Sequence, residues 1–274
     1  MTKYWIVCAR AAMAAGLVFA LGHGAPRARA QGGRGPQIKV ADAKPGDTRL
    51  IVSNGIRAPF EAVKAQAQQA VGHPFIIEYG ASLGLKSTIE SGQAFEVAIV
   101  TPEVIEDMTK QGKIVPGSRF DVARVPVAIG QRGYAPKSDI GTPAALKQAL
   151  LNAKGIRFAF LGASRPTVDK MFKELALGEA IKDKIIMDGP GAPGPRREVT
   201  LGPGEYELII NLASEVLPMK TQVYLGSIPD EFQIPAVMAA GIGVGGDQEA
   251  AKALIKFLRG PAIDPFLKEN GMQR

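Results

Sequence analysis

The sequence predicts an α/β protein built from mostly parallel sheets that are flanked by helices. Two observations predict this class. Strand-like and helix-like segments alternate from residue 49 to residue 260, and two of the strands run directly into a small-residue loop that opens a helix. The first of these strands, residues 50–52, ends in Ser53-Asn54-Gly55, and the second, residues 75–79, ends in Gly80-Ala81-Ser82.

The elements up to residue 120 follow one another in β-α-β-α-β order. Apolar residues at helical spacing follow the first strand, and Pro59 suits the first turn of that helix. A second helix ends at Gly92, and a third begins at Thr101-Pro102 after the short apolar strand 97–100. This order is typical of parallel strands joined by helices. The apolar positions of the three helices are Phe60, Val63, Ala67, Val71, Leu85, Ile89, Val104, Ile105 and Met108.

The rest of the chain follows the same pattern, apart from residues 189–195 (GPGAPGP), which form a surface loop because they suit no regular element. One helix begins at the Thr142-Pro143 cap, and the loop 162–167 opens the next. The remaining strands and the terminal helix are expected at 122–129 (through Pro126), 156–161, 207–211, 234–240 and 249–258.

The first thirty residues have the pattern of a cleavable export signal. Basic residues accompany the apolar run 11–21, which is too short to span a bilayer, and Ala28-Arg29-Ala30 fits the small-x-small cleavage rule. We therefore expect residues 1–30 to be a signal peptide, residues 31–48 to be a flexible N-terminal arm, and the mature protein to reside in the periplasm. An uncleaved anchor is the alternative.

Removal of the signal changes what chemistry the chain can perform. The only cysteine, Cys8, leaves with it, so we expect no disulfide and no cysteine-bound metal, and His73 becomes the only histidine. Four cations and no acids leave as well, so the formal net charge falls from +7 to +3. This excess is too small to indicate nucleic-acid binding, but it favours a small anion. No cofactor or metal is expected.

The two small-residue junctions indicate what kind of ligand the protein binds. Where a strand leads into a helix, the first backbone N–H groups of the helix have no partners within the helix, and the helix dipole favours negative charge at that point. Two such junctions on one sheet make an anion-binding site. Ser82 also has a plainer interpretation, since a serine at a helix start is often only a cap.

The order and spacing of these segments resemble the periplasmic solute-binding proteins of ABC importers, of the molybdate-binding type. The resemblance covers roughly residues 49–274. It is carried by Ser53-Asn54-Gly55-Ile56, by Gly80-Ala81-Ser82-Leu83-Gly84 with Ile89-Glu90-Ser91-Gly92, and by the ending 253–272.

This resemblance implies two lobes joined by two crossing strands in the type II periplasmic binding protein fold. Lobe one would contain residues 49–120 and 241–274, and lobe two residues 121–240, with hinge strands near 120–131 and 229–240. A monomer would capture a small anion in the cleft between the lobes, close by hinge motion, and deliver the anion to an ABC permease in the inner membrane.

The resemblance also implies which residues contact the ligand, and two of them depart from the family pattern. A serine hydroxyl is usual near Gly55, and a tyrosine is usual where Asn211 stands. Because several arginines lie in or beside the loops, and a guanidinium matches a carboxylate bidentately, the ligand is either a molybdate-type oxyanion or a small organic carboxylate. The expected ligand-binding residues are Ser53, Asn54, Gly55, Arg57, Gly80, Ala81, Ser82, Ser164, Arg165, Thr167, Arg196, Arg197 and Asn211.

Enzymatic function is not expected from the motifs. Gly80-Ala81-Ser82-Leu83-Gly84 has the Gly-x-Ser-x-Gly spacing of a nucleophile elbow, but His73, which a catalytic triad would need, belongs to a turn before a strand. The glycine-rich run 241–246 follows a strand but lacks the acidic partner of a dinucleotide site. A sensor that reports to a membrane receptor and an exported enzyme on a similar scaffold remain alternatives.

Overall fold

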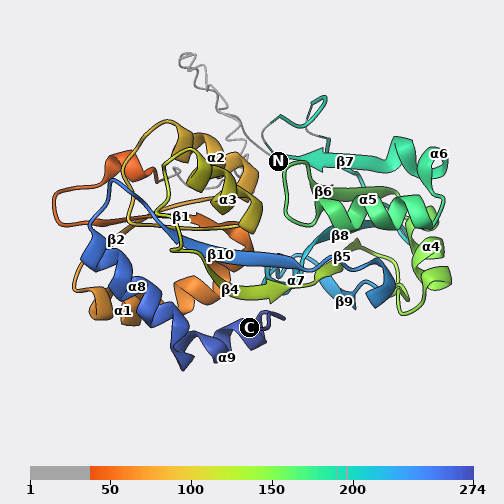
Figure 1. Cartoon of the computed structure of the whole chain (residues 1–274). Helices are drawn as coiled ribbons and strands as arrows, with labels where there is room; N and C mark the ends of the chain where they lie inside the picture. Colours follow the sequence, from red (N-terminus) through yellow and green to blue (C-terminus); the bar gives the residue numbers. More distant parts are fainter. Residues whose placement is uncertain (1–37, 190, 196) are drawn as a thin grey trace, which may run out of the picture. The chain divides into compact units, whose positions relative to one another are not determined.

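The computed structural model describes residues 38–189, 191–195 and 197–274. The expected signal peptide and the first part of the arm therefore lie outside the described residues, as does Arg196. The predicted fold class is confirmed, because the described chain forms two five-stranded sheets flanked by helices (Figure 1). None of the helices in the described ranges is long and apolar enough to cross a membrane.

The first sheet has the strand order β2-β1-β3-β10-β4. β1 pairs in parallel with β2 and β3, so the carboxyl ends of the three strands reach the same edge of the sheet. β10 is antiparallel to β3 and β4, which makes the sheet mixed where mostly parallel pairing is predicted. The bounds are β1 (Thr48–Ser53), β2 (Phe75–Gly80), β3 (Val97–Val100), β4 (Phe120–Val125) and β10 (Ala236–Ile242).

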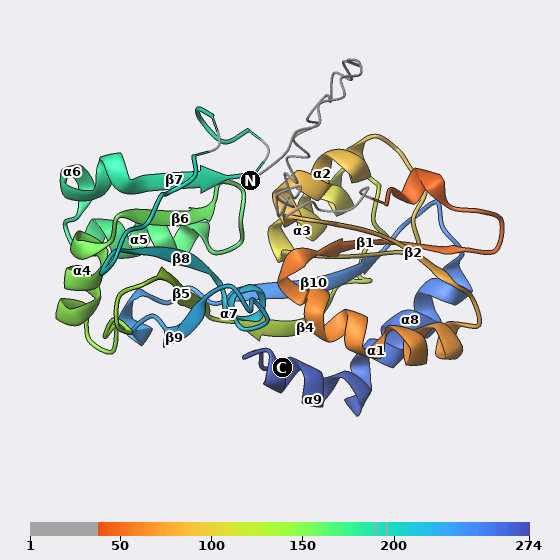
Figure 2. The same cartoon turned by 180° about the vertical axis from the view of Figure 1, so that it is seen from behind.

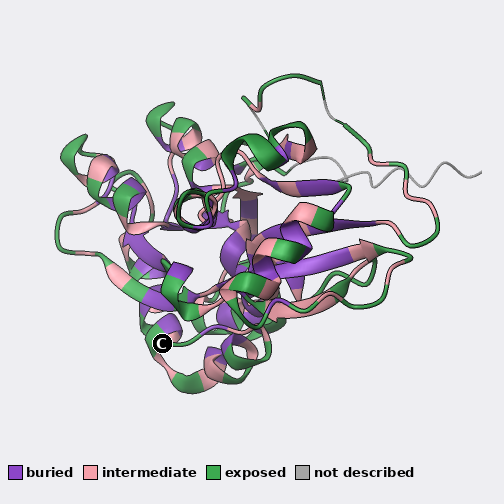
Figure 3. Cartoon of the chain, turned by 90° about the vertical axis from the view of Figure 1, so that its right-hand side faces the viewer, coloured by how far each residue is buried: buried purple, intermediate pink, exposed green. Residues whose placement is uncertain are grey.

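Helices cover both faces of this sheet because its strand residues alternate between them. Leu50 and Val52 pack on one side against α1 (Arg57–Val71) and α8 (Gln248–Arg259). Ile51 points to the other side, where α2 (Ser82–Glu90) and α3 (Pro102–Lys110) cover it. Among the strands between these helices, β1, β3 and β10 are almost wholly buried. Figure 3 shows that buried residues concentrate in the strands and exposed ones in the outer helices and loops.

The second sheet has the order β7-β6-β8-β5-β9 and is mixed in the same way. β6 is parallel to β7 and β8, whereas β5 is antiparallel to β8 and β9. Figure 2 shows the sheet from behind. Its elements are β5 (Val127–Gly133), α4 (Pro143–Asn152), β6 (Gly155–Ala159), α5 (Arg165–Glu174), β7 (Ile185–Asp188), β8 (Tyr206–Leu212) and β9 (Val223–Ser227), with the short helices α6 (Gly178–Ile181) and α7 (Ala213–Val216).

The chain crosses between the sheets twice. The first crossing is at Pro126, where the single strand expected over 122–129 is in fact two strands, β4 and β5, in different sheets. Proline lacks the N–H that a continuous ladder needs, which explains the break. The return lies between β9 and β10, and the chain then ends in α8 and α9 (Asp264–Glu269).

The described part of the expected arm is packed against the first sheet. Val40, in a 3-10 turn, is buried in the core on the α2 side. The Lys39 ammonium lies 2.7 Å from the buried Glu78 carboxylate, which also accepts the Val40 N–H and the Thr88 hydroxyl. Residues 39–42 are thus part of the folded unit, because they supply both a cation and a backbone N–H to the buried Glu78 carboxylate.

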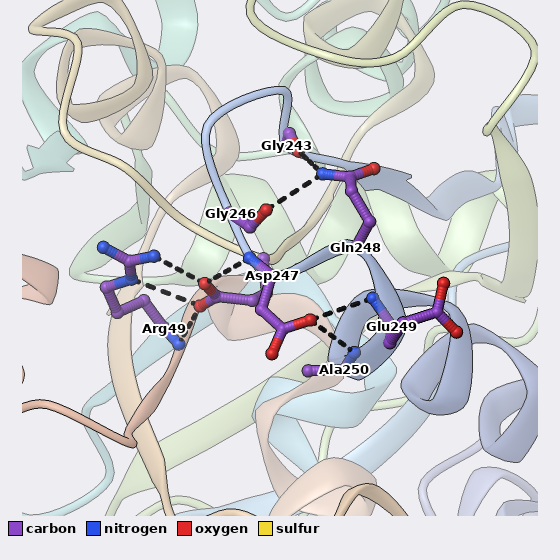
Figure 4. Close-up of polar contacts among 8 residues, drawn as sticks. Arg49, Gly243, Gly246, Asp247, Gln248, Glu249 and Ala250 are labelled. Carbon is purple, nitrogen blue, oxygen red and sulfur yellow. Dashed lines mark hydrogen bonds and ion pairs between the residues drawn. The ribbon is translucent and has the colours of Figure 1, made fainter.

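The glycine-rich run 241–246 has a structural explanation. A Cβ on Gly243 would lie 2.1 Å from the Phe95 carbonyl oxygen, and one on Gly246 would lie 2.4 Å from the same atom. The turn therefore needs glycine to approach the neighbouring backbone. Gln248 closes the turn by donating to the carbonyls of Gly243 and Gly246, at 2.8 and 3.1 Å (Figure 4).

Asp247 caps helix α8 at the end of this turn. Its Oδ1 accepts from the N–H groups of Ala250 and Glu249 at 3.1 and 2.9 Å (Figure 4). These two backbone donors, Ala250 first, lower the pKa of the Asp247 carboxyl below its usual value. The Asp247 N–H itself donates to the buried Glu96, which also pairs with Arg49 at 2.5 Å. The turn is thus tied to the amino end of β3.

Candidate functional site

Three strand-to-helix junctions lie side by side at the carboxyl edge of the first sheet. β1 ends at Ser53 before a 3-10 turn, β2 is followed by Ala81 and helix α2, and β3 is followed by Thr101 and helix α3. No side chain caps α2 or α3. Ser82 is the first residue of α2 rather than its cap, so its hydroxyl is available for another role.

Two buried hydroxyls connect these junctions. The Ser82 hydroxyl donates to Ser53 Oγ at 3.0 Å and accepts the Thr101 N–H at 3.2 Å. Ser53 Oγ also accepts the Gly55 N–H at 3.3 Å. Both serines are almost fully buried, with 3% and 2% of their surface exposed. The carboxyl ends of β1, β2 and β3 therefore share one hydrogen-bonded group.

One of the two hydroxyl protons of this serine pair has no hydrogen-bond acceptor within the pair. Two hydroxyls carry two protons, and one of these forms the bond between Ser53 and Ser82. The other proton has no acceptor among the described residues, whichever serine donates to its neighbour. A buried donor without a partner is costly, so the pair calls for an acceptor from outside the described residues.

A second set of donors lies at the carboxyl edge of the second sheet. Asn211, near the end of β8, accepts the Leu212 N–H at 2.9 Å and the hydroxyl of the fully buried Ser164 at 3.4 Å. Both bonds use the amide oxygen Oδ1. The Nδ2 amide keeps its two protons without an acceptor in the described part of the chain. Ser164 precedes helix α5, as Ser53 precedes the 3-10 turn after β1.

The two sets of donors are joined at Gly55. The Ser214 hydroxyl, three residues after Asn211, donates to the Gly55 carbonyl at 2.6 Å in a buried contact. A Cβ on Gly55 would lie 2.7 Å from Leu212 Cδ1 and 3.1 Å from the Met238 side chain. The backbone of Gly55 is thus engaged within the protein, and glycine is needed there for packing.

Arg57 lies over an aromatic ring at the start of α1. Its guanidinium carbon is 4.6 Å from the centroid of Tyr79, on β2. The Tyr79 hydroxyl donates to Glu61 at 2.8 Å. Burial, followed by this bond to the carboxylate, raises the pKa of Tyr79 far above its usual range. Tyr79 therefore supports Arg57 and uses its only proton within the protein.

Arg165 has a similar arrangement at the start of α5. Its guanidinium lies 5.6 Å from the ring centroid of Phe158 and 6.0 Å from that of Phe160. Its Nε donates to Asp169, one turn further along the helix, at 2.7 Å. Each sheet thus has one arginine in the first turn of a helix, held against an aromatic side chain and beside a carboxylate.

The other expected site residues are placed differently. Thr167 is fully buried, and its hydroxyl both donates to and accepts from the backbone of Ile234 at 3.0 Å. Arg197 donates to the Asp183 carbonyl, which precedes β7 and so lies at the amino ends of the parallel strands, opposite Ser164. The segment around Arg197 is held there by Arg157, whose Nη2 donates to the Arg197 carbonyl at 2.8 Å.

Three expected residues lie at the junctions without a bond that assigns them a role. Asn54 is half-buried in the 3-10 turn after β1. Gly80 packs on Leu85, since a Cβ there would lie 2.9 Å from that side chain, and Ala81 follows it. Sequence reasoning missed Thr101 as a site residue, although Thr101-Pro102 repeats the pattern of a strand, a small polar residue and a helix. It also missed Ser214, for which the sequence has no signal.

Comparisons with known proteins identify the family of this chain. The family model described as bacterial extracellular solute-binding protein matches residues 48–273. The molybdate-binding protein ModA of Azotobacter vinelandii is 27% identical over 248 residues, which cover 86% of this chain and 94% of that protein. Aconitate isomerase of a Pseudomonas species is 23% identical over 239 residues, covering 84% and 89%.

A solved structure shows the same fold. The periplasmic molybdate-binding protein of Azotobacter vinelandii matches with a TM-score of 0.66 at 15% identity, over 83% of this chain and 99% of that structure. At this identity the match concerns the fold and not the ligand.

Proposed function

We propose that this chain, which belongs to the bacterial extracellular solute-binding proteins, captures a small anion between its two sheets and delivers it to an ABC importer. The observation that supports this proposal best is the surplus of donors on both sheets. The serine pair of the first sheet keeps one proton without an acceptor, and Asn211 keeps two. A ligand composed of acceptors only would complete both sets.

The donors come from neutral groups whose positions are fixed by burial and by their mutual bonds. Such a site binds an ionised oxyanion or carboxylate without placing a second buried charge in the protein. The contact between Ser214 and Gly55 brings the loop after β8 against the loop after β1, so one ligand can reach donors from both sheets. Closure of the sheets over it would be a hinge motion.

The ligand class depends on the two arginines. A small tetrahedral oxyanion needs only the buried donors. An organic acid with two or three carboxylates would occupy the same donors with one group and reach Arg57 or Arg165 with another. The two relatives, one a molybdate-binding protein and the other an aconitate isomerase, correspond to these two classes.

Isomerisation of an organic acid is a second candidate function, favoured by the aconitate isomerase relative. Moving a proton on carbon requires a base within reach of the substrate. The groups that form the donor sets are hydroxyls, amides and backbone N–H groups. The carboxylates one turn after Arg57 and Arg165, those of Glu61 and Asp169, are engaged by Tyr79 and Arg165. We therefore favour binding over catalysis.

A thermal-shift screen of the mature protein tests the proposal. The panel contains molybdate, tungstate, sulfate, phosphate and di- and tricarboxylates, including aconitate, with putrescine as a cationic control. A true ligand at 100 times its Kd adds about 2.7 kcal/mol to the free energy of unfolding. Failure of the whole anion panel would reject the proposal. Proton NMR of aconitate incubated with the protein would reveal isomerisation, if that second function were correct.

A further inference from the structure

The second crossing between the sheets is fastened to the second sheet by side chains. The Gln233 amide pairs with both backbone groups of Val127, accepting its N–H at 3.0 Å and donating to its carbonyl at 2.8 Å. The same amide donates to the Ile228 carbonyl at 3.1 Å. Gln233 thus replaces the strand ladder that this segment lacks.

Helix α5 fastens the same segment from its other side. The Thr167 hydroxyl donates to the Ile234 carbonyl and accepts the Ile234 N–H, each at 3.0 Å. One turn further, the Lys170 ammonium donates to the Glu231 carbonyl at 2.6 Å. Thr167 has no exposed surface, so these two bonds do not compete with water.

Two residues after Ile234 the chain is already in the first sheet. Ala236 begins β10 and is paired with Val125 of β4, so only Pro235 separates Ile234, which α5 holds, from the first sheet. In the first crossing the Pro126 carbonyl accepts the Ala213 N–H at 2.8 Å, while Val125 is already in β4. In each of the two crossings, a single proline therefore connects the two sheets.

The torsions that remain free at these junctions are few. Proline fixes its own φ, and it restricts the residue before it to extended conformations. Rotation of one sheet against the other must therefore fall on the ψ torsions of Pro126 and Pro235 and on the residues that precede them, Val125 and Ile234. Ile234 is the residue that Thr167 holds.

We infer that Thr167 is a positioning residue that couples the ligand to the hinge. Three residues before it, Ser164 forms the Asn211 donor set, and the first turn of α5 carries both side chains. A ligand that displaces the first turn of α5 therefore also displaces Ile234 and changes the backbone torsions at Pro235. Thr167 serves closure by this route, and the ligand contact expected from the sequence is not its role. This inference rests on the proposed function.

Distance measurements between spin labels test the coupling. Lys252 on α8 and Lys182 after α6 are exposed, and the mature sequence without residues 1–30 has no cysteine, so cysteines at these two positions label one site near each sheet. The variants are Thr167→Val, which keeps the shape and removes the hydroxyl, and Thr167→Ser, which keeps the hydroxyl. Molybdate and citrate serve as probes.

We expect Thr167→Val to broaden the distance distribution of the free protein and to speed dissociation of the bound probe by about fivefold or more, with Thr167→Ser close to the parent protein. If the distance distribution of Thr167→Val is unchanged, the inference is overturned. This holds even if the affinity of Thr167→Val falls, because a loss of affinity without a change in the distribution indicates that Thr167 contacts the ligand directly. If neither probe binds, the proposed function is in doubt, but the width of the free distribution still decides the coupling.

Hydrogen exchange of the parent protein provides a measurement that needs no variant. The Ile234 N–H is expected to exchange slowly in the free protein, as amides in the sheet core do, because Thr167 holds it. Exchange of Ile234 as fast as that of an exposed loop amide would overturn the inference, even if Thr167→Val failed to fold.

Discussion

The serine pair makes a prediction that depends on counting protons. Ser53 and Ser82 are replaced by alanine, singly and together. Each single variant leaves one hydroxyl, and that hydroxyl still has its proton and no acceptor within the described chain. Only the double variant removes the last proton. We therefore expect the two single variants to be mild and the double variant to be severe.

The structure sets the size of the effects. A single variant loses the bond between the serines, a neutral hydrogen bond with a net value of about 0.5–1.5 kcal/mol, so affinity falls about 2- to 12-fold. The double variant also loses a hydrogen bond to a charged ligand, about 1.5–3 kcal/mol. Its loss should exceed that of either single variant by that amount, which is about 10- to 150-fold in Kd.

Titration calorimetry with the tightest-binding anion of the screen measures these affinities. Ser87→Ala is the matched control, because Ser87 lies on the same helix α2, is exposed, and bonds only to the Gly84 carbonyl. Urea unfolding of each variant shows that the fold is retained. If one single variant lost as much affinity as the double, the shared proton would be the wrong explanation.

Three further predictions concern packing, charge and pH. Gly55→Ala is expected to lower the free energy of unfolding by about 1–3 kcal/mol through overpacking, whereas Gly84→Ala, with open space at its Cβ, should raise it by up to about 1 kcal/mol; urea unfolding measures both. Arg165→Ala should weaken binding of a tricarboxylate at least about tenfold by calorimetry, while Arg197→Ala leaves it unchanged; equal effects would refute the placement of Arg197. The lowered pKa of Asp247 means that its ionised form stabilises the fold above its unfolded pKa, about 3.9, and that this contribution is lost as pH falls through the folded pKa. The difference in melting temperature between the parent protein and Asp247→Asn should therefore shrink below about pH 4, and a difference independent of pH would exclude the cap's charge as its cause.

The sequence was sufficient for the features that local chemistry determines. A short apolar strand, a small polar residue and a helix start are all adjacent in sequence, so the junctions at Ser53 and Ser82 could be predicted. The split at Pro126 could have been predicted as well, because a proline does not continue a central strand. The same pattern at Thr101 was visible, but nothing local indicates that its N–H reaches Ser82.

Other features depend on contacts between distant residues. Arg197 lies close in sequence to a glycine-rich loop, and only the bonds to Asp183 and Arg157 place it at the amino ends of the strands. Docking of residues 39–42 depends on Glu78, which is buried on β2 and finds its cation in Lys39. The alternation of apolar and polar residues along a strand predicts neither the placement of Arg197 nor the docking of residues 39–42. Charged residues are buried only where a partner from another segment pairs with them.

The donor surplus also bears on which anions can bind. The amide oxygen of Asn211 already accepts two protons, and no carboxylate belongs to either donor set, so a proton carried by the ligand would meet no strong acceptor. Inorganic phosphate keeps at least one proton near neutral pH, whereas sulfate, molybdate and most carboxylates keep none. Burying that proton unpaired costs about 1–3 kcal/mol, which is about 5- to 150-fold in affinity. We therefore expect the proposed site to prefer fully ionised anions over phosphate, and this expected preference follows from the hydrogen bonds within the protein rather than from its net charge.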